Sequence, residues 1–446
     1  MCDRMGTERS GGPPGPSGLP VVGNARQFAS DPLSFYEEVA REYGPIARYA
    51  LGGREFYQLS DPELVEQVLV HQNGRFDKGE EYRRILTPVI GNGLLISEDE
   101  FWRRQRHRME PAFHPEALAE YAPTLVEHTE RLLGDWRDGT VRDVHADMMQ
   151  LTVEIAAKTL FDTDIRKYEA NISDALEAVM DRSEKRLERP IEIPDSVPTP
   201  GNRRYKRALS TLYEIATEIV EAHDGTGDDV VSRLLRAKSN ADGLDDEQIR
   251  DEVVTLLLAG HETTALALTY TLYLLATNPE QAGRLGAELD EKAGGGPLST
   301  DVIEELSYTK RTLREGMRVY PPVQSVIREA TEPVEIGGYE LDEGAVVTAP
   351  QWVLHRDPRF YEEPESFRPA RWGESFRESL PRFAYFPFGG GPRRCIGENF
   401  AKQEMRLALA TIARDWEFEA VTDELSLSPS ITLRPDGPVK LRVSRR

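Results

Sequence analysis

One apolar stretch constrains the fold of this 446-residue chain more than any other feature. The sequence LDDEQIRDEVVTLLLAGHETTALALTYTLYLLATNPE begins with Asp245 as a candidate N-cap and ends where Pro279 stops a helix. At about 1.5 Å per residue, a helix of this length would cross a whole domain. Its middle is apolar on nearly every face, so we expect it to be buried, with the remaining chain packed around it.

The rest of the chain also reads mainly as helix, with a few short strands. We expect helices between 64 and 225, with loops at 88–98 and 188–204, and a further helix over 307–320. Small hairpins are expected at 46–63 and around Gly337 and Gly338. Because no repeat or clean boundary divides the chain, the sequence predicts a flexible arm over 1–11 and one large, mainly α domain over 12–446.

The amino-acid composition limits the classes of partner and the cellular compartment that we expect for this protein. The chain carries 77 acidic against 55 basic residues, a net charge of −22. Such a charge disfavours nucleic acid and anionic membranes as partners. Two explanations of this negative charge stay open: the protein comes from a salt-adapted organism, or it is an ordinary acidic bacterial protein. The absence of a signal-peptide core, of a membrane anchor and of a disulfide framework predicts a cytoplasmic protein. We also expect a monomer.

The middle of the long helix holds polar residues in the sequence AGHETT, among them Glu262 and Thr263. In one interpretation, the threonine hydroxyls bond to carbonyls one turn earlier and Glu262 pairs with a buried arginine. In the other, the acid and the alcohol deliver protons into a dry pocket. A zinc-protease helix is excluded, because Ala265 stands where His-Glu-x-x-His needs its second histidine.

A second pair of charged residues lies one helical turn apart. Glu315 and Arg318 in REGMR share a helix face, and Arg371 in FRPARW is a candidate third partner. The pair is either a surface ion pair of little energetic value or a buried structural clamp.

Cys395, one of two cysteines, lies in the glycine- and arginine-rich sequence FGGGPRRCIG. Arg394 stands where a dinucleotide fingerprint needs its third glycine, and no phosphate-loop Gly-Lys-Ser/Thr follows. No local signature supports a nucleophilic cysteine. The pattern favours a lone thiolate ligand at the start of the next helix, whose dipole stabilises an anion.

Together these residues resemble the cytochrome P450 family. The family's haem-binding signature F-x-x-G-x-R-x-C-x-G is met by Phe388, Gly391, Arg393, Cys395 and Gly397. Its oxygen-activation pattern is met by Ala259, Gly260, Glu262, Thr263 and Thr264, and its E-x-x-R pair by Glu315 and Arg318, with Arg371 as third member. Trp102 and Arg106 resemble the element that grips one haem propionate, and Arg328 resembles the arginine that holds the other.

The resemblance implies a helical fold with small β-sheets and haem b bound between the long helix and the cysteine loop. Cys395 would be the axial iron ligand, Ala259 would line the cofactor site, and Arg393 would meet a propionate. Glu262 and Thr263 would govern proton delivery. The enzyme would insert one atom of O₂ into a C–H bond, using electrons from a separate ferredoxin- or flavodoxin-type donor and its reductase.

Two other functions stay open: a haem-thiolate enzyme that uses peroxide or isomerises its substrate, and a non-catalytic haem sensor or carrier. The acid–alcohol pair and the variable loop TPVIGNGLLISEDE favour the monooxygenase. Substrate-facing segments are expected at 80–98, 166–215 and 258–266, whose apolar residues suit a fatty acid, terpenoid or carotenoid. A basic patch for the electron donor is expected at Arg103, Arg104, Arg106, Arg108, Arg394, Lys402 and Arg406.

Overall fold

The computed structural model describes residues 12–168, 172, 174–179, 181–182, 194, 197–238, 244–294 and 296–446. The expected arm 1–11 and part of the expected loop 188–204 lie outside the described residues. Backbone contacts divide the chain into two compact units. The sheet unit comprises Met1–Arg83, Gln324–Pro364 and Ser379–Arg394, and the helical unit comprises Arg84–Val323, Glu365–Glu378 and Cys395–Arg446. The single domain over 12–446 stays a prediction.

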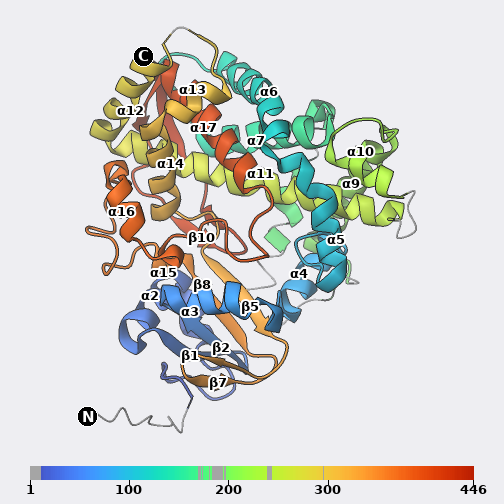
Figure 1. The fold of residues 1–446 in the computed structure, drawn as a ribbon, viewed down its shortest axis with the longest axis vertical. Helices are drawn as coiled ribbons and strands as arrows, with labels where there is room; N and C mark the ends of the chain where they lie inside the picture. Colours follow the sequence, from blue (N-terminus) through green and yellow to red (C-terminus); the bar gives the residue numbers. More distant parts are fainter. Residues whose placement is uncertain are drawn as a thin grey trace. The chain divides into compact units, whose positions relative to one another are not determined.

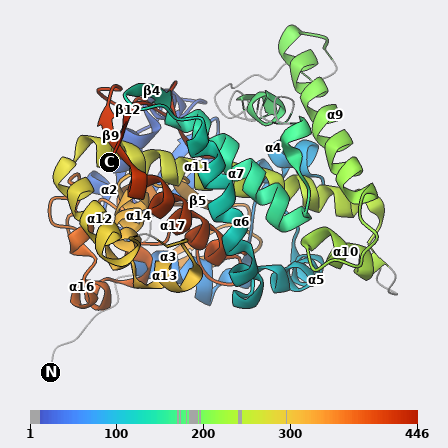
Figure 2. The same cartoon turned by 90° about the horizontal axis from the view of Figure 1, so that it is seen from above.

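The helical unit is built around α11 (Asp246–Thr277), the long helix expected from the sequence. The predicted N-cap is confirmed, because the Asp245 side chain accepts a hydrogen bond from the Gln248 backbone N–H. Helices α7, α9, α14 and α17 pack against it, and α6 and α7 lie over it in Figure 2. Among the described residues, α11 alone is long and apolar enough to cross a membrane, but 83% of that window is buried inside the protein, as in a core helix.

The other elements of the helical unit surround α11 or form small sheets at its margin (Figure 1). The strand order in its larger sheet is β4-β12-β9, and β10 pairs with β11. The elements are α5 (Asp99–Met109), α6 (Pro115–Gly134), β4 (Thr140–Asp143), α7 (Val144–Phe161), α9 (Pro200–Glu221), α10 (Val230–Lys238), α12 (Pro279–Lys292), α13 (Thr300–Glu305), α14 (Ser307–Val319), α16 (Glu374–Ser379), α17 (Glu398–Asp415), β9 (Trp416–Ala420), β10 (Leu427–Pro429), β11 (Leu433–Pro435) and β12 (Lys440–Arg445).

The sheet unit contains a five-stranded sheet of order β1-β2-β8-β5-β3, in which β2 and β8 are parallel and the other pairs antiparallel. Both expected hairpins are present, as β1–β2 and β6–β7. The elements are α1 (Ala25–Ser30), α2 (Pro32–Tyr43), β1 (Ile46–Leu51), β2 (Arg54–Leu59), α3 (Pro62–Glu66), β3 (Phe76–Asp77), β5 (Ser325–Ala330), β6 (Val334–Ile336), β7 (Tyr339–Leu341), β8 (Val346–Pro350) and α15 (Gln351–Leu354), while α4 (Glu80–Ile90) continues into the helical unit.

Two boundaries differ from the sequence-based expectation. Helix α4 continues through Pro88 to Ile90, so the loop predicted from residue 88 begins later. The stretch Thr140–Asp143, expected to be helical, is strand β4, because it pairs with β12 near the end of the chain. Pairing across such a sequence separation leaves no local pattern to read.

Candidate active site

One face of α11 is open where the sequence predicted a site. Helix α11 is buried along most of its length, yet Ala259 is exposed and Gly260 and Thr263 are half-buried. Ala259 and Thr263 are four residues apart and therefore share a face. The Thr263 hydroxyl donates to the Ala259 carbonyl oxygen at 3.0 Å. We call Ala259, Gly260 and Thr263 the open strip; it presents one hydroxyl and otherwise small apolar groups.

Glu262 and His261 lie away from solvent, and His145 is half-buried. Glu262 is buried, pairs with Arg434 of β11 and accepts a hydrogen bond from the Thr432 hydroxyl at 3.1 Å. Burial lowers the pKa of His261 to about 3 and that of His145 to about 4, so both are neutral at pH 7. Two contacts of the local interpretation of AGHETT are present: the bond from the Thr263 hydroxyl to the Ala259 carbonyl, and the pair of Glu262 with Arg434, which is half-buried. A proton-delivery role stays a prediction.

Cys395 is exposed and lies three residues before the first residue of α17. The helix has Gly397 as its N-cap residue. A Cβ added at Gly397 would lie 4.0 Å from the Cys395 Sγ and 3.7 Å from the Phe113 ring, so glycine keeps the space beside the sulfur clear. A thiolate here would lie at the positive end of the helix dipole.

Position 391 has to be glycine for a reason that lies within the sheet unit. Its φ is +69°, and an added Cβ would lie 1.7 Å from the Leu69 carbonyl oxygen. The sequence-based interpretation gave this glycine the task of approaching the sulfur and the cofactor. The structure adds that the backbone could not pass the turn at Gln67–His71 with any side chain at this position. Phe388, the first residue of the motif, is half-buried.

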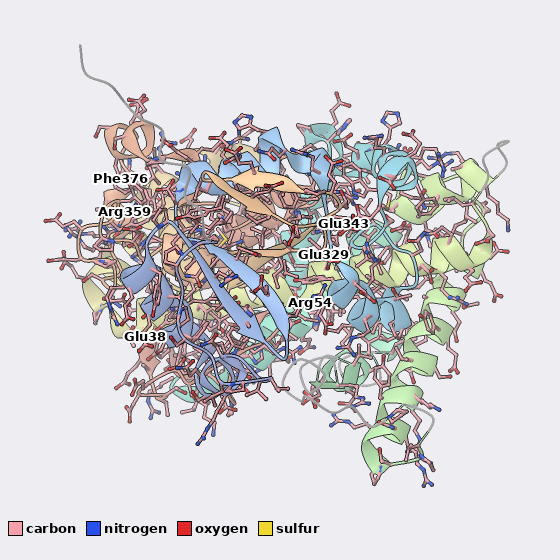
Figure 3. The ribbon with its side chains drawn as sticks, turned by 90° about the horizontal axis from the view of Figure 1, so that it is seen from below. Glu38, Arg54, Glu329, Glu343, Arg359 and Phe376 are labelled. Atoms are coloured by element: carbon pink, nitrogen blue, oxygen red, sulfur yellow. The ribbon has the colours of Figure 1, made fainter. Side chains whose placement is uncertain are left out.

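Arg328 is a buried cation in the sheet unit. Its Nη1 donates to the Ile327 carbonyl oxygen at 2.7 Å, and among the described residues no carboxylate forms an ion pair with it. The neighbouring Glu329 pairs instead with Arg54 (Figure 3), and Asp77 pairs with Arg83 at 2.8 Å. Burial lowers the pKa of Arg328 to about 10, which still leaves it charged at neutral pH. An anionic ligand would satisfy this arginine.

The other two arginines that the sequence predicted to bind propionates, Arg393 and Arg106, are partly buried. Burial lowers the pKa of Arg393 in the sheet unit to about 10. In the helical unit, the Arg106 guanidinium lies over the Trp102 ring at 5.8 Å on α5, and both side chains are half-buried. A guanidinium of this kind suits recognition of a carboxylate.

Glu315 on α14 is the acceptor at the centre of a buried network. Glu315 and Arg318 are 0% exposed, and the Arg318 Nε and Nη2 donate to the two carboxylate oxygens at 2.9 Å. The same carboxylate accepts bonds from the Arg371 Nε at 2.9 Å, the Trp372 Nε1 at 2.8 Å and the Arg368 backbone N–H at 2.9 Å. The pair is therefore buried and joins α14 to the segment around Pro369–Arg371.

Comparison with known proteins decides the family. The family model described as Cytochrome P450 matches residues 13–443. The chain is a cytochrome P450. Relatives include Cyclooctatin synthase of Streptomyces melanosporofaciens, 37% identical over 96% of this chain and 92% of its own, and Pentalenene oxygenase of Streptomyces avermitilis, 31% identical over 95% and 92%.

A solved structure agrees with this assignment. The crystal structure of the cytochrome P450DA heme domain has a TM-score of 0.87 and 29% identity, covering 97% of both chains. Another relative, 35% identical over 91% of this chain and 89% of its own, is named Cyclooctat-9-en-7-ol 5-monooxygenase. The predicted fold class, mainly helical with small sheets, is confirmed, and this P450 is a haem-dependent monooxygenase.

The described residues of this P450 fit haem. The open strip offers small apolar groups and one hydroxyl, Cys395 offers a thiol at a helix start, and Arg328 is a buried cation without a carboxylate partner among the described residues. The roles that the motifs imply, Cys395 as the iron ligand and Arg106, Arg328 and Arg393 as partners of the propionates, stay predictions. When bound, haem supplies the iron at which O₂ is activated.

Three residues of these networks were not found from the sequence. Trp372 and Arg368 flank Arg371 in FRPARW, so their closeness to the motif was the available signal. Arg434 lies 172 residues from Glu262, and nothing in the sequence links the two.

Replacing Glu315 by Ala is expected to prevent stable haem incorporation. The substitution leaves two buried arginines without their carboxylate, at a cost of about 3–5 kcal/mol. The measurement is urea unfolding together with the ratio of haem to protein. As the control, Glu280→Ala removes an exposed acid that pairs with Arg284 one turn away, which should cost less than about 1 kcal/mol. Equal stability and haem content in the two variants would contradict the clamp.

Proposed function

We propose that this cytochrome P450 is a cytoplasmic enzyme that hydroxylates a terpenoid, with electrons from a separate ferredoxin- or flavodoxin-type donor. The observation that carries the proposal is the open strip of α11, where Ala259 and Gly260 present a small apolar surface beside the Thr263 hydroxyl. Such a face suits a bulky hydrocarbon that approaches through shape and dispersion forces.

The sequence left a fatty acid, a terpenoid or a carotenoid as possible substrates, and the names of the relatives favour the terpenoid. The names of three relatives at 31–37% identity refer to cyclooctatin, to cyclooctat-9-en-7-ol and to pentalenene. A fatty acid stays the alternative, because substrate identity varies widely on one fold.

Thr263 and Glu262 are proposed to hold and move the protons that the reaction consumes. Thr263 lies on the open strip, so its hydroxyl could hold a proton on the open side of α11 while bonding to the Ala259 carbonyl. Glu262 is the adjacent acid, held by Arg434 and Thr432 on the side of α11 away from solvent. In this proposal the hydroxyl positions the proton and the acid replenishes it.

The electron donor is proposed to dock on exposed basic residues of α5 and α17. Arg104 is exposed, Arg103 is 68% exposed while paired with Glu100, and Lys402 is 40% exposed while paired with Glu398. The C-terminal side of α5 lies near the first turn of α17, because Phe113 and Phe400 have ring centroids 6.5 Å apart.

The other members of the expected patch contribute less within the helical unit. Arg406 is 13% exposed and pairs with Glu304, and Arg108 donates to the Gln105 side chain at 2.9 Å. The proposed patch is therefore Arg103, Arg104 and Lys402.

The substrate proposal is tested by titrating the haem-loaded protein with two lipids of equal carbon number. A cyclic diterpene alcohol should displace water from the haem iron and shift the main absorption band at micromolar concentration. A straight-chain fatty acid is the matched control and should shift it only at much higher concentration. The reverse order of affinities would favour the fatty-acid alternative.

Replacing Thr263 by Ala should leave haem content and substrate binding near those of the wild type but uncouple the reaction. NADPH would be consumed while hydrogen peroxide forms in place of product, because the proton is no longer positioned. The matched control is Thr264→Ala, since the neighbouring hydroxyl is buried and lies off the open strip. Coupling that is equal in the two variants would leave Thr263 with only its bond to the Ala259 carbonyl.

Charge reversal tests the docking patch. Arg104→Glu combined with Lys402→Glu should slow reduction by an acidic ferredoxin about tenfold at low salt and flatten the salt dependence of the rate. Substrate affinity should be unchanged. Arg284→Glu with Lys158→Glu makes the same charge change on α12 and α7 and serves as the control. Wild-type reduction rates in the α5–α17 variant would place the donor elsewhere.

A further inference from the structure

The loop after α4 is fastened to the first turns of α11 by a buried carboxylate. Glu252 is 0% exposed, and one of its oxygens accepts the Leu94 backbone N–H at 2.8 Å. Its other oxygen accepts bonds at 3.2 Å from the Gln105 side chain of α5 and the Gln248 side chain of α11. A single carboxylate therefore ties the loop and α5 to the same turn of α11.

Other contacts also hold the loop after α4 against the first turns of α11. Asp251 accepts the Asn92 backbone N–H at 3.0 Å, and the Gln248 side chain donates to the Asn92 carbonyl oxygen at 3.1 Å. A Cβ added at Gly93 would lie 1.9 Å from the Thr255 Oγ1. The sequence Gly91-Asn92-Gly93 therefore lets the backbone lie directly on α11.

Glu252 lies on the side of α11 that carries the open strip. Ala259 follows Glu252 by seven residues and Thr263 by eleven, spacings that return to one helix face. The distance along the axis from Glu252 to Ala259 is about 10 Å, at roughly 1.5 Å per residue. Thr255, which Gly93 approaches, lies one turn before Ala259. The fastened loop is thus a neighbour of the strip within the helical unit.

A carboxylate in this position has a cost that apolar packing would not have. Burial raises the pKa of Glu252 to about 7, although its hydrogen bonds act in the opposite direction. An apolar side chain could hold the elements together, but it could not fix the position of one backbone N–H. The directional bonds to the loop and to α5 are what the carboxylate adds.

We propose that Glu252 is a positioning residue that sets the specificity of this P450, by fixing loop 91–97 and α5 relative to the open strip. The inference rests on the proposed function only in that substrate is oxidised beside that strip. It predicts that losing the carboxylate reshapes the pocket without removing the cofactor.

The test uses the haem-loaded full chain and two ligands that need no knowledge of the substrate. Imidazole is small enough to reach the iron whatever the loop does, whereas phenylimidazole carries a ring that has to fit beside the loop. In Glu252→Gln, the affinity for phenylimidazole should fall about tenfold and that for imidazole less than about twofold, as expected for the loss of a hydrogen bond that holds the loop. Both affinities are read from the haem absorption band.

The matched control is Glu288→Gln. Glu288 on α12 is also buried, and its carboxylate accepts the backbone N–H groups of Tyr308 and Thr309 at 2.6 and 2.8 Å, at the start of α14. Its loss should lower stability and leave the ratio of the two affinities unchanged.

Gln248→Ala, at a partly exposed position, removes only one donor to the Asn92 carbonyl and to Glu252, so it keeps the test usable if Glu252→Gln does not fold. It should change the affinity ratio in the same direction, by a smaller factor. An unchanged ratio in Glu252→Gln and in Gln248→Ala would overturn the proposal. Neither ligand is a terpenoid, so this outcome is independent of the substrate titration.

Discussion

Burying α11 on nearly every side obliges the surrounding chain to satisfy each polar group that the helix carries. Asp251 and Glu252 are met by backbone N–H groups of the loop after α4, and Glu262 is met by Arg434. Among the described residues His261 pairs with no charged side chain, and burial lowers its pKa to about 3, which keeps it neutral. Because each partner comes from a distant stretch of chain, satisfying the helix also fixes where those stretches lie.

The same requirement explains how a chain of net charge −22 can hold carboxylates in its interior. Glu315 is surrounded by arginine, indole and backbone donors, and Glu288 accepts the N–H groups that begin α14. Glu404 on α17 is different. It is buried, neither of its carboxylate oxygens has a partner among the described residues, and burial raises its pKa well above the usual range. Burial therefore favours the neutral form of this acid.

Family membership and specificity depend on different parts of the chain. The matched family region spans residues 13–443, and relatives near one-third identity carry names that refer to different molecules. A shared fold and cofactor thus leave the substrate undetermined. On the function proposed above, the residues that distinguish one member from another would be those beside the open strip and in the loops held against α11. Glu252, which holds such a loop in place, would belong to that set.

Local features were predictable from the sequence. The Asp245 N-cap, the burial of the long helix and the two glycine hairpins each depend on residues within a turn or two of one another. The spacing of Glu315 and Arg318, and the family motif around Cys395, are equally local. The residues that pair with these elements across the fold were not predictable. Strand β4, the Glu262–Arg434 pair and the bonds of Glu252 to Leu94 and Gln105 join positions more than a hundred residues apart. Only tertiary packing decided these contacts, because a buried charge takes its partner from whichever segment the fold brings beside it.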